Sequence, residues 1–98
     1  RLFDGNIKTT QAEHDYVMAK VGSAASRLKD AECTIEVRLT DENGPKGGID
    51  KRCRIEVVLQ GHPCQVVEAV AGDLYSAIDS ASKRLGRTVH RSFERAFI

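Results

Sequence analysis

The sequence predicts one α+β domain with the element order β-α-β-β-β-α, folded as one four-stranded sheet with two helices packed on one face. Three observations predict this fold. Two stretches carry apolar residues at helical spacing, further stretches alternate apolar with polar residues as half-buried strands do, and turn residues separate them. A chain of 98 residues has no room for a second independent core, so residues 1–98 are expected to form a single domain.

The first half of the chain contains the first predicted helix and the clearest strand. A short strand near Leu2-Phe3 is expected to precede a helix from Thr10 to about Lys29, and Thr10 with Glu13 forms a capping-box pattern at its start. The apolar stripe of this helix consists of Val17, Val21, Ala24 and Leu28. A strand should follow, with an inward face made of Cys33, Ile35, Val37 and Leu39.

The second half contains two more strands and a long helix. After the Gly-rich segment 41–50, a second strand is expected to turn inward Cys53, Ile55, Val57 and Leu59. The turn Gly61-His62-Pro63 leads to a third strand from Cys64 to Val70, which makes an antiparallel hairpin. Asp73 is the predicted N-cap of a helix that runs to roughly Arg95. Its apolar stripe consists of Leu74, Ile78, Ala81, Leu85 and Val89.

The composition favours a soluble domain in the cytoplasm. Hydrophobic residues make up 41% of the chain, which is enough for a core and too much for a disordered segment. No apolar run approaches the roughly 20 residues of a membrane span, and the first residues lack a signal-peptide core. The chain does not begin with Met, which suggests that a few leading residues precede this numbering.

The residues predict neither a metal centre nor a catalytic site. Cys33, Cys53 and Cys64 form no CxxC pair, and His62 with Cys64 offers two ligands where a structural zinc ion needs four. The same pair would need a third, orienting group to act as nucleophile and base, and the sequence suggests none. Cys33 and Cys53 are expected to be buried thiols on the inward strand face. We therefore expect no cofactor, no small-molecule substrate and no enzymatic activity.

The charge of the chain is unevenly divided. Residues 1–50 carry seven Lys/Arg and nine Asp/Glu, and residues 51–98 carry eight and five, so the two halves have net charges of −2 and +3. An anion-binding surface is therefore expected in the second half.

A row of basic residues follows the second predicted helix. Its members are Lys83, Arg84, Arg87, Arg91 and Arg95. The four arginines are three, four and four residues apart, so at about 100° per residue they share a narrow arc away from the apolar stripe. A solvated helix end is the simpler interpretation, because the helix dipole favours cations there. Stacked like charges repel one another, however, and a planar guanidinium group suits phosphate, so the row predicts RNA binding.

A second basic cluster opens the strand after the Gly-rich segment. Lys51, Arg52 and Arg54 form this cluster, with Arg52 and Arg54 on the outward face, and we include all three in the predicted RNA-binding set. Aromatic residues are few and none forms a base-stacking platform on a strand. Contacts to phosphates and RNA shape are therefore expected instead of base-by-base recognition.

Two other classes of binding module remain open from the residues alone. A double-stranded RNA-binding domain has the α-β-β-β-α order, but its lysines lie at the start of the second helix, where this chain has Asp73-Leu74-Tyr75. A protein-interaction module would use the open face of the sheet. The charges of that face, which could also form cross-strand pairs, are Glu36, Arg38, Arg54 and Glu56.

The second helix also carries a recognisable motif. The run Asp73-Leu74-Tyr75-Ser76-Ala77-Ile78-Asp79, followed by Arg84-Leu85, Arg87, Val89 and Arg91, resembles the last helix of the ribosome hibernation-promoting factors, also called ribosome-associated inhibitors or sigma-54 modulation proteins. The segment Asn6-Ile7-Lys8 before the first helix is similar as well, so the resemblance spans nearly the whole chain.

The resemblance implies a β-α-β-β-β-α domain that binds the small ribosomal subunit between head and body. There it would overlap the mRNA and tRNA sites and block translation in stationary phase or stress. The family's RNA-contacting residues carry over onto Arg84, Arg87 and Arg91, and the basic row itself adds Lys83 and Arg95. The partner expected is ribosomal RNA, with the protein monomeric when off the ribosome. Tyr75 is expected to be a half-buried packing residue.

Two departures from the family pattern matter. The segment Asp41–Asp50 is longer and richer in Gly than the resemblance leads us to expect, and it could be either an RNA-reaching loop or a long hairpin connection. The chain ends at Ile98, without the extra C-terminal domain of the long family members, so it resembles the short class.

Overall fold

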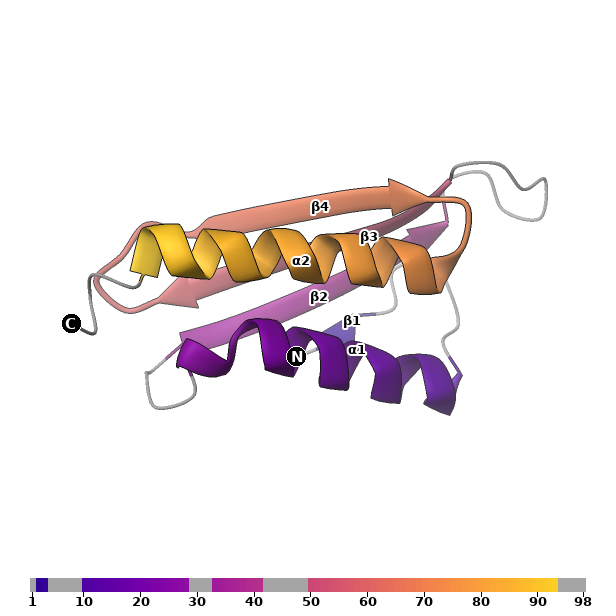
Figure 1. Cartoon of the computed structure of the whole chain (residues 1–98), viewed down its shortest axis with the longest axis horizontal. Coiled ribbons are helices and arrows are strands. Elements are labelled where there is room, and N and C mark those ends of the chain that lie inside the picture. The colour runs from indigo at the N-terminus through magenta and orange to yellow at the C-terminus, as the bar shows by residue number, and fades with distance from the viewer. Residues whose placement is uncertain (1, 4–9, 29–32, 42–49, 94–98) are drawn as a thin grey trace.

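A three-stranded antiparallel sheet covered on one face by two helices forms the body of the protein (Figure 1). The structure is a computed structural model that describes residues 2–3, 10–28, 33–41 and 50–93. Its elements are β1 (Leu2–Phe3), α1 (Gln11–Ala24), the 3₁₀ turn η1 (Ser26–Leu28), β2 (Cys33–Asp41), β3 (Lys51–Leu59), β4 (Gln65–Ala71) and α2 (Leu74–Phe93). The predicted α+β class, with two helices on an antiparallel sheet, is confirmed.

The three long strands form a meander in which each pairs with the next. Cys33 of β2 lies opposite Leu59 of β3, and Ile55 of β3 lies opposite Val67 of β4. The two residues of β1 lie beside β2 in the parallel sense, with Leu2 opposite Val37. The face of the sheet opposite the helices is here called the open face, and β4 is the edge strand on the side of α2 (Figure 1).

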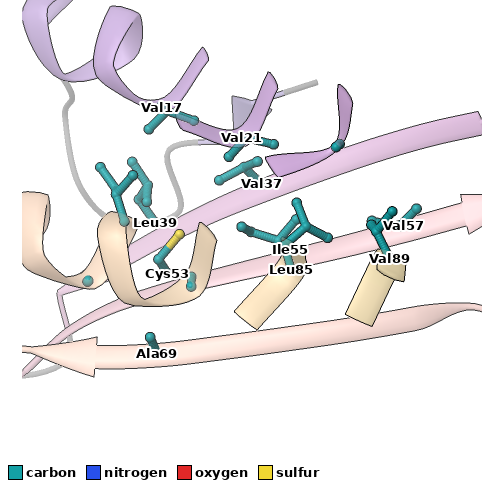
Figure 2. Packing of buried hydrophobic residues seen from close by; sticks show 14 of the residues in the cluster. Val17, Val21, Val37, Leu39, Cys53, Ile55, Val57, Ala69, Leu85 and Val89 are labelled. Atoms are coloured by element: carbon teal, nitrogen blue, oxygen red, sulfur yellow. The ribbon is translucent and has the colours of Figure 1, made fainter. Parts of the chain in front are cut away.

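The core lies between the sheet and the helices (Figure 2). The alternation predicted for β2 and β3 is confirmed, because their buried side chains are the alternate residues Val37, Leu39, Cys53, Ile55, Val57 and Leu59. The predicted stripe of α2 is buried in full, and it consists of Leu74, Ile78, Ala81, Leu85 and Val89. Cys33 and Ile35 are only partly buried, since they lie at the start of β2 and pack against the margin of the core.

Helix α1 begins where the sequence predicts and ends earlier. The backbone amide of Glu13 donates to Thr10 Oγ1 at 3.1 Å, and the amide of Thr10 donates to Glu13 Oε1 at 2.8 Å, which completes the capping box. The helix stops at Ala24 instead of continuing to Lys29, and a 3₁₀ turn follows in which Leu28 N–H bonds to Ala25 O at 2.9 Å. This tighter turn puts Leu28 into the core. Lys29 lies outside the described residues.

Helix α2 begins one residue after its predicted N-cap. The amide of Ser76 donates to Asp73 Oδ1 at 2.9 Å, and the Ser76 hydroxyl donates to Asp73 Oδ2 at 2.8 Å. These hydrogen bonds favour the ionised carboxylate and lower the pKa of Asp73. The capping role predicted for Asp73 is therefore confirmed. The predicted end near Arg95 lies outside the described residues, which extend to Phe93.

The two helices run side by side in the same direction and contact each other through the family-like motif (Figure 1). The Tyr16 hydroxyl donates to Asp79 Oδ1 at 2.5 Å, and the rings of Tyr16 and Tyr75 pack edge to face with centroids 4.8 Å apart. Lys20 Nζ lies 3.7 Å from Asp79 Oδ1. The carboxylate beside the phenol raises the pKa of Tyr16. Tyr75 is thus a packing residue, as predicted, and Tyr75 and Asp79 of the motif hold α1 against α2.

None of the helices in the described ranges is long and apolar enough to cross a membrane.

Candidate nucleic-acid interface

Four cations lie together on the exposed flank of α2. Lys83, Arg84, Arg87 and Arg91 are all exposed, and they are here called the basic face. The burial of Leu85 and Val89 orients the helix, so the four cations, which lie off this buried stripe, point away from the core. Within the described part of the chain, no carboxylate lies within 4.0 Å of the charged groups of these four residues. The basic face is therefore available to an anion. Arg95, also predicted for this surface, lies outside the described residues.

A groove runs between α2 and the edge strand β4. It is here called the edge groove, and its walls are formed by Val66, Val67, Glu68, Arg84, Arg87, Thr88 and Arg91. Three arginines of α2 thus line one depression together with Val66, Val67 and Glu68 of β4. A polyanion in this groove would meet several arginines at once, and an arginine fork can donate two hydrogen bonds to one phosphate.

Arg84 is positioned by the backbone of the edge strand. Its Nη1 donates to the carbonyl oxygen of Glu68 at 2.7 Å, and β4 is an edge strand of the sheet. A guanidinium group has five N–H donors, so this one bond leaves most of the donors of Arg84 to other partners. The contact fixes Arg84 beside β4 without neutralising its charge.

Arg52 and Arg54 lie on the open face, as the strand alternation predicts, and both are near a carboxylate. Arg52 Nη1 bonds to Glu68 Oε2 at 2.8 Å, and Arg54 Nε lies 3.9 Å from Glu68 Oε1. The register explains both contacts, because Glu68 is directly opposite Arg54 and diagonal to Arg52. All three side chains remain between a third and a half exposed.

Lys51 occupies a different environment from its two neighbours. Its ammonium lies 2.8 Å from Asp50 Oδ1 and 3.2 Å from Asp41 Oδ2, and the Asp50 side chain is fully buried. The hydrogen bond to Asp50 is the largest cause of a raised pKa of Lys51. Lys51 thus neutralises a buried carboxylate at the end of the β2-β3 pair, a role that the sequence pattern did not indicate.

Directly facing charges of β2 and β3 on the open face have the same sign. The register puts Arg38 opposite Arg54 and Glu36 opposite Glu56, so the directly facing side chains have like charge. The expectation of opposite-charge pairs therefore does not hold for the directly facing positions of β2 and β3, whereas Arg54 of β3 directly faces Glu68 of β4. Like charges at such positions are unfavourable.

The thiols do not support a catalytic role. Burial raises the pKa of Cys53 to about 12, so this thiol stays protonated at neutral pH. Cys64 is exposed, but its Sγ lies 3.1 Å from Glu56 Oε1 and the pKa of Cys64 is raised by that hydrogen bond. Neither environment favours a thiolate nucleophile. In the described ranges, no three His, Cys, Asp or Glu side chains gather to hold a metal ion.

Sequence reasoning missed Glu68, the residue that contacts both basic clusters. The available signal was modest: Glu68 is the only acid in the third predicted strand, and its position in the alternation directs it outward. Its partners depend on the strand register, which the residue pattern alone did not define.

Comparison with known proteins agrees with this geometry. The profile of the family described as "Sigma 54 modulation protein / S30EA ribosomal protein" matches residues 4–96. Among curated proteins, no sequence match reaches significance. A crystal structure of the Thermus thermophilus Protein Y N-terminal domain is similar, with a TM-score of 0.73 and 37% identity over 92% of this chain and 92% of that chain. A ribosomal subunit interface protein from Coxiella burnetii shares the fold at a TM-score of 0.72 and 15% identity, over 93% of this chain and 92% of that one.

The chain belongs to the sigma-54 modulation / S30EA ribosomal protein family, a family of ribosome-associated factors. The resemblance seen in the motif of α2 is thereby confirmed.

Proposed function

We propose that this protein binds the small ribosomal subunit in the mRNA and tRNA channel through phosphates of ribosomal RNA, and inhibits translation during stationary phase or stress. It acts as a monomer in the cytoplasm. The single observation that carries the proposal is the basic face, whose four cations are exposed and lack a carboxylate partner in the described part of the chain. The proposed contacts are Lys83, Arg84, Arg87, Arg91 and Arg95, with Lys51, Arg52 and Arg54 in support.

The physical basis is release of counterions from the RNA backbone. Each phosphate neutralised by a cation frees a condensed counterion, so affinity falls steeply as salt rises. The basic face also contains like charges at i,i+3 and i,i+4 spacing, and a polyanion would relieve their repulsion. The small subunit presents a dense phosphate surface, and this chain belongs to a ribosome-associated family.

The start of α2 disfavours a double-stranded RNA-binding domain. Such a domain requires lysines there, whereas Asp73 caps the helix and Tyr75 packs on Tyr16. An interaction module unrelated to ribosomes does not agree with the family of the chain.

The test is cosedimentation of the purified protein with small ribosomal subunits at low and high salt. The triple variant Arg84→Ala, Arg87→Ala, Arg91→Ala should lose most binding, by roughly 100-fold or more if each removed phosphate contact weakens affinity about fivefold. Its far-ultraviolet circular dichroism should be unchanged, because all three side chains are exposed.

A matched control is Lys20→Ala, which removes a cation from α1, on the other helix. This variant should bind as the wild type does. Equal binding by the triple variant and the wild type would show that the basic face is not the RNA-binding surface.

A further inference from the structure

The two basic clusters meet at one residue of the edge strand. Glu68 contacts Arg84 of the basic face through its backbone carbonyl, and Arg52 and Arg54 of the open face through its carboxylate. The carbonyl bond lies in the edge groove, whereas the carboxylate lies on the opposite side of the sheet. Only the thickness of one strand therefore separates guanidinium groups that belong to two faces of the molecule.

The outer side of β4, which lies between the two basic clusters, is accessible. β4 is the last strand in the order, and in the described ranges no other strand pairs with its outer side (Figure 1). Val66 of β4 is 44% exposed beside Glu68 and lines the edge groove. A chain of phosphates could thus pass from α2 over β4 to the open face without crossing a bulky obstacle among the described residues.

RNA phosphates that follow this path would have to displace the Glu68 carboxylate from its arginine partners. Its pairs with Arg52 and Arg54 are partly exposed, and pairs of this kind contribute little net stability. A phosphate oxygen can take the same donors of Arg52, since carboxylate and phosphate both accept from the guanidinium fork. Exchange of one anion for the other keeps both arginines paired, so its energetic cost is small.

We infer that one strand of RNA crosses the edge of β4, with phosphates on the basic face at one side and on Arg52 and Arg54 at the other, and that it displaces the carboxylate of Glu68. This inference rests on the proposed function. Glu68 restrains the affinity in this arrangement, because it occupies two arginines before RNA arrives and repels the phosphates that pass over it. Arg84 keeps its place, because its partner is the backbone of Glu68 and not the side chain.

The experiment measures binding of small ribosomal subunits by Glu68→Gln, with Glu36→Gln as the matched control. Both variants remove one negative charge from the open face, but Glu36 lies on β2, two strands away from the edge. Glu68→Gln should raise affinity about two- to fivefold, as expected for a partly exposed charge. Glu36→Gln should change it less.

The same two substitutions are then made in an Arg52→Ala, Arg54→Ala background. There Glu68→Gln should lose most of its effect, and the removal of the two arginines should make the salt slope shallower by about one per arginine. Equal effects of Glu68→Gln with and without the arginines, or equal effects of Glu68→Gln and Glu36→Gln, would overturn the crossing path.

The outcomes separate this inference from the proposed function. If the basic-face triple variant loses binding while Glu68→Gln and the arginine substitutions have no effect, RNA stays on the α2 side and only the crossing path is wrong. If the wild type binds no ribosomal particle in dilute buffer, both are wrong.

Discussion

The basic residues of this protein differ in whether a carboxylate already lies beside the positive charge. Arg87 and Arg91 have no carboxylate within 4.0 Å in the described ranges, Arg52 shares Glu68 with Arg54, and Lys51 lies against a buried carboxylate. Residue type and spacing alone predicted the same role for all of them. The contacts divide them into cations that are free to bind phosphate, cations that must first exchange a partner, and one cation that stabilises the fold.

Lys51→Ala should destabilise the protein instead of simply weakening RNA binding. The substitution leaves Asp50 buried without its counterion, which is unfavourable in a low-dielectric environment. The melting temperature should fall clearly more than it does for Arg54→Ala, which removes an exposed cation from the same strand. Thermal unfolding followed by circular dichroism measures both variants, and equal melting temperatures would contradict a structural role for Lys51.

The pH dependence of this effect has a definite sign. The pKa of Lys51 is raised in the folded protein, so the contribution of its charge is fully present below the unfolded-state pKa of about 10.5. It is lost as pH rises through the still higher folded-state pKa. The difference in melting temperature between wild type and Lys51→Ala should therefore be constant at neutral pH and shrink above about pH 10.5.

At the scale of elements, α2 carries three different surfaces on one helix. One stripe packs on the sheet, a second side meets α1 through Tyr75 and Asp79, and a third presents the basic face. Gly86 lies where α2 approaches α1, and a Cβ atom built on it would be 4.0 Å from Ala24 Cβ. This distance is ordinary van der Waals contact, so the packing does not require glycine there.

Gly86→Ala should stabilise the protein by about 0.5–1 kcal/mol, because alanine loses less backbone entropy than glycine in a helix interior. Urea unfolding of the variant and the wild type measures the difference in the free energy of unfolding. Gly61→Ala is the contrasting substitution, since Gly61 has φ +83 in the turn before β4 and a side chain there is strained. That variant should lose about 1–2 kcal/mol. A destabilised Gly86→Ala protein would mean that the helices pack more closely than described.

The elements themselves were largely predictable from the residue pattern. Period-two alternation identified the inward faces of β2 and β3 because one side of each strand is buried and the other is not. The capping residues Thr10 and Asp73 identified the helix starts, because their side chains bond to nearby amides in the same chain segment. The end of α1 was predicted too late, since Leu28 continues the helical spacing while reaching the core through a 3₁₀ turn.

At the scale of the whole molecule, the residue pattern could not predict which strands and which faces come into contact. The pairing of Lys51 with Asp41 depends on the β2-β3 register, and the contact of Glu68 with Arg84 depends on α2 lying beside β4. Both are contacts between separate segments, and periodicity within one segment carries no information about them. The basic face could be predicted because helical geometry determines it locally. The link between the two basic clusters could not be predicted in that way.

The basic face should make ribosome binding and folding respond to salt in opposite directions. The three arginines of the basic face should contribute between about −2.1 and −2.7 to the slope of log affinity against log salt, so through them a rise from about 50 to 200 mM weakens binding roughly 20- to 40-fold. The same salt screens repulsion between Arg87 and its neighbours Lys83, Arg84 and Arg91, which lie three or four residues away on α2. The melting temperature should therefore rise slightly as binding weakens.

Arg87→Gln tests whether one residue accounts for part of both effects. It removes three like-charge contacts, each unfavourable by a few tenths of a kcal/mol, so the variant should be about 0.5 kcal/mol more stable than wild type at low salt. It should also make the salt slope of binding shallower by about one. Paired measurements of urea unfolding and subunit cosedimentation, at about 50 and 200 mM salt, compare the variant with wild type. If Arg87 contacts an RNA phosphate, the salt slope must change, and if it repels the neighbouring cations, the free energy of unfolding must change. An unchanged slope together with unchanged stability would therefore mean that Arg87 does neither.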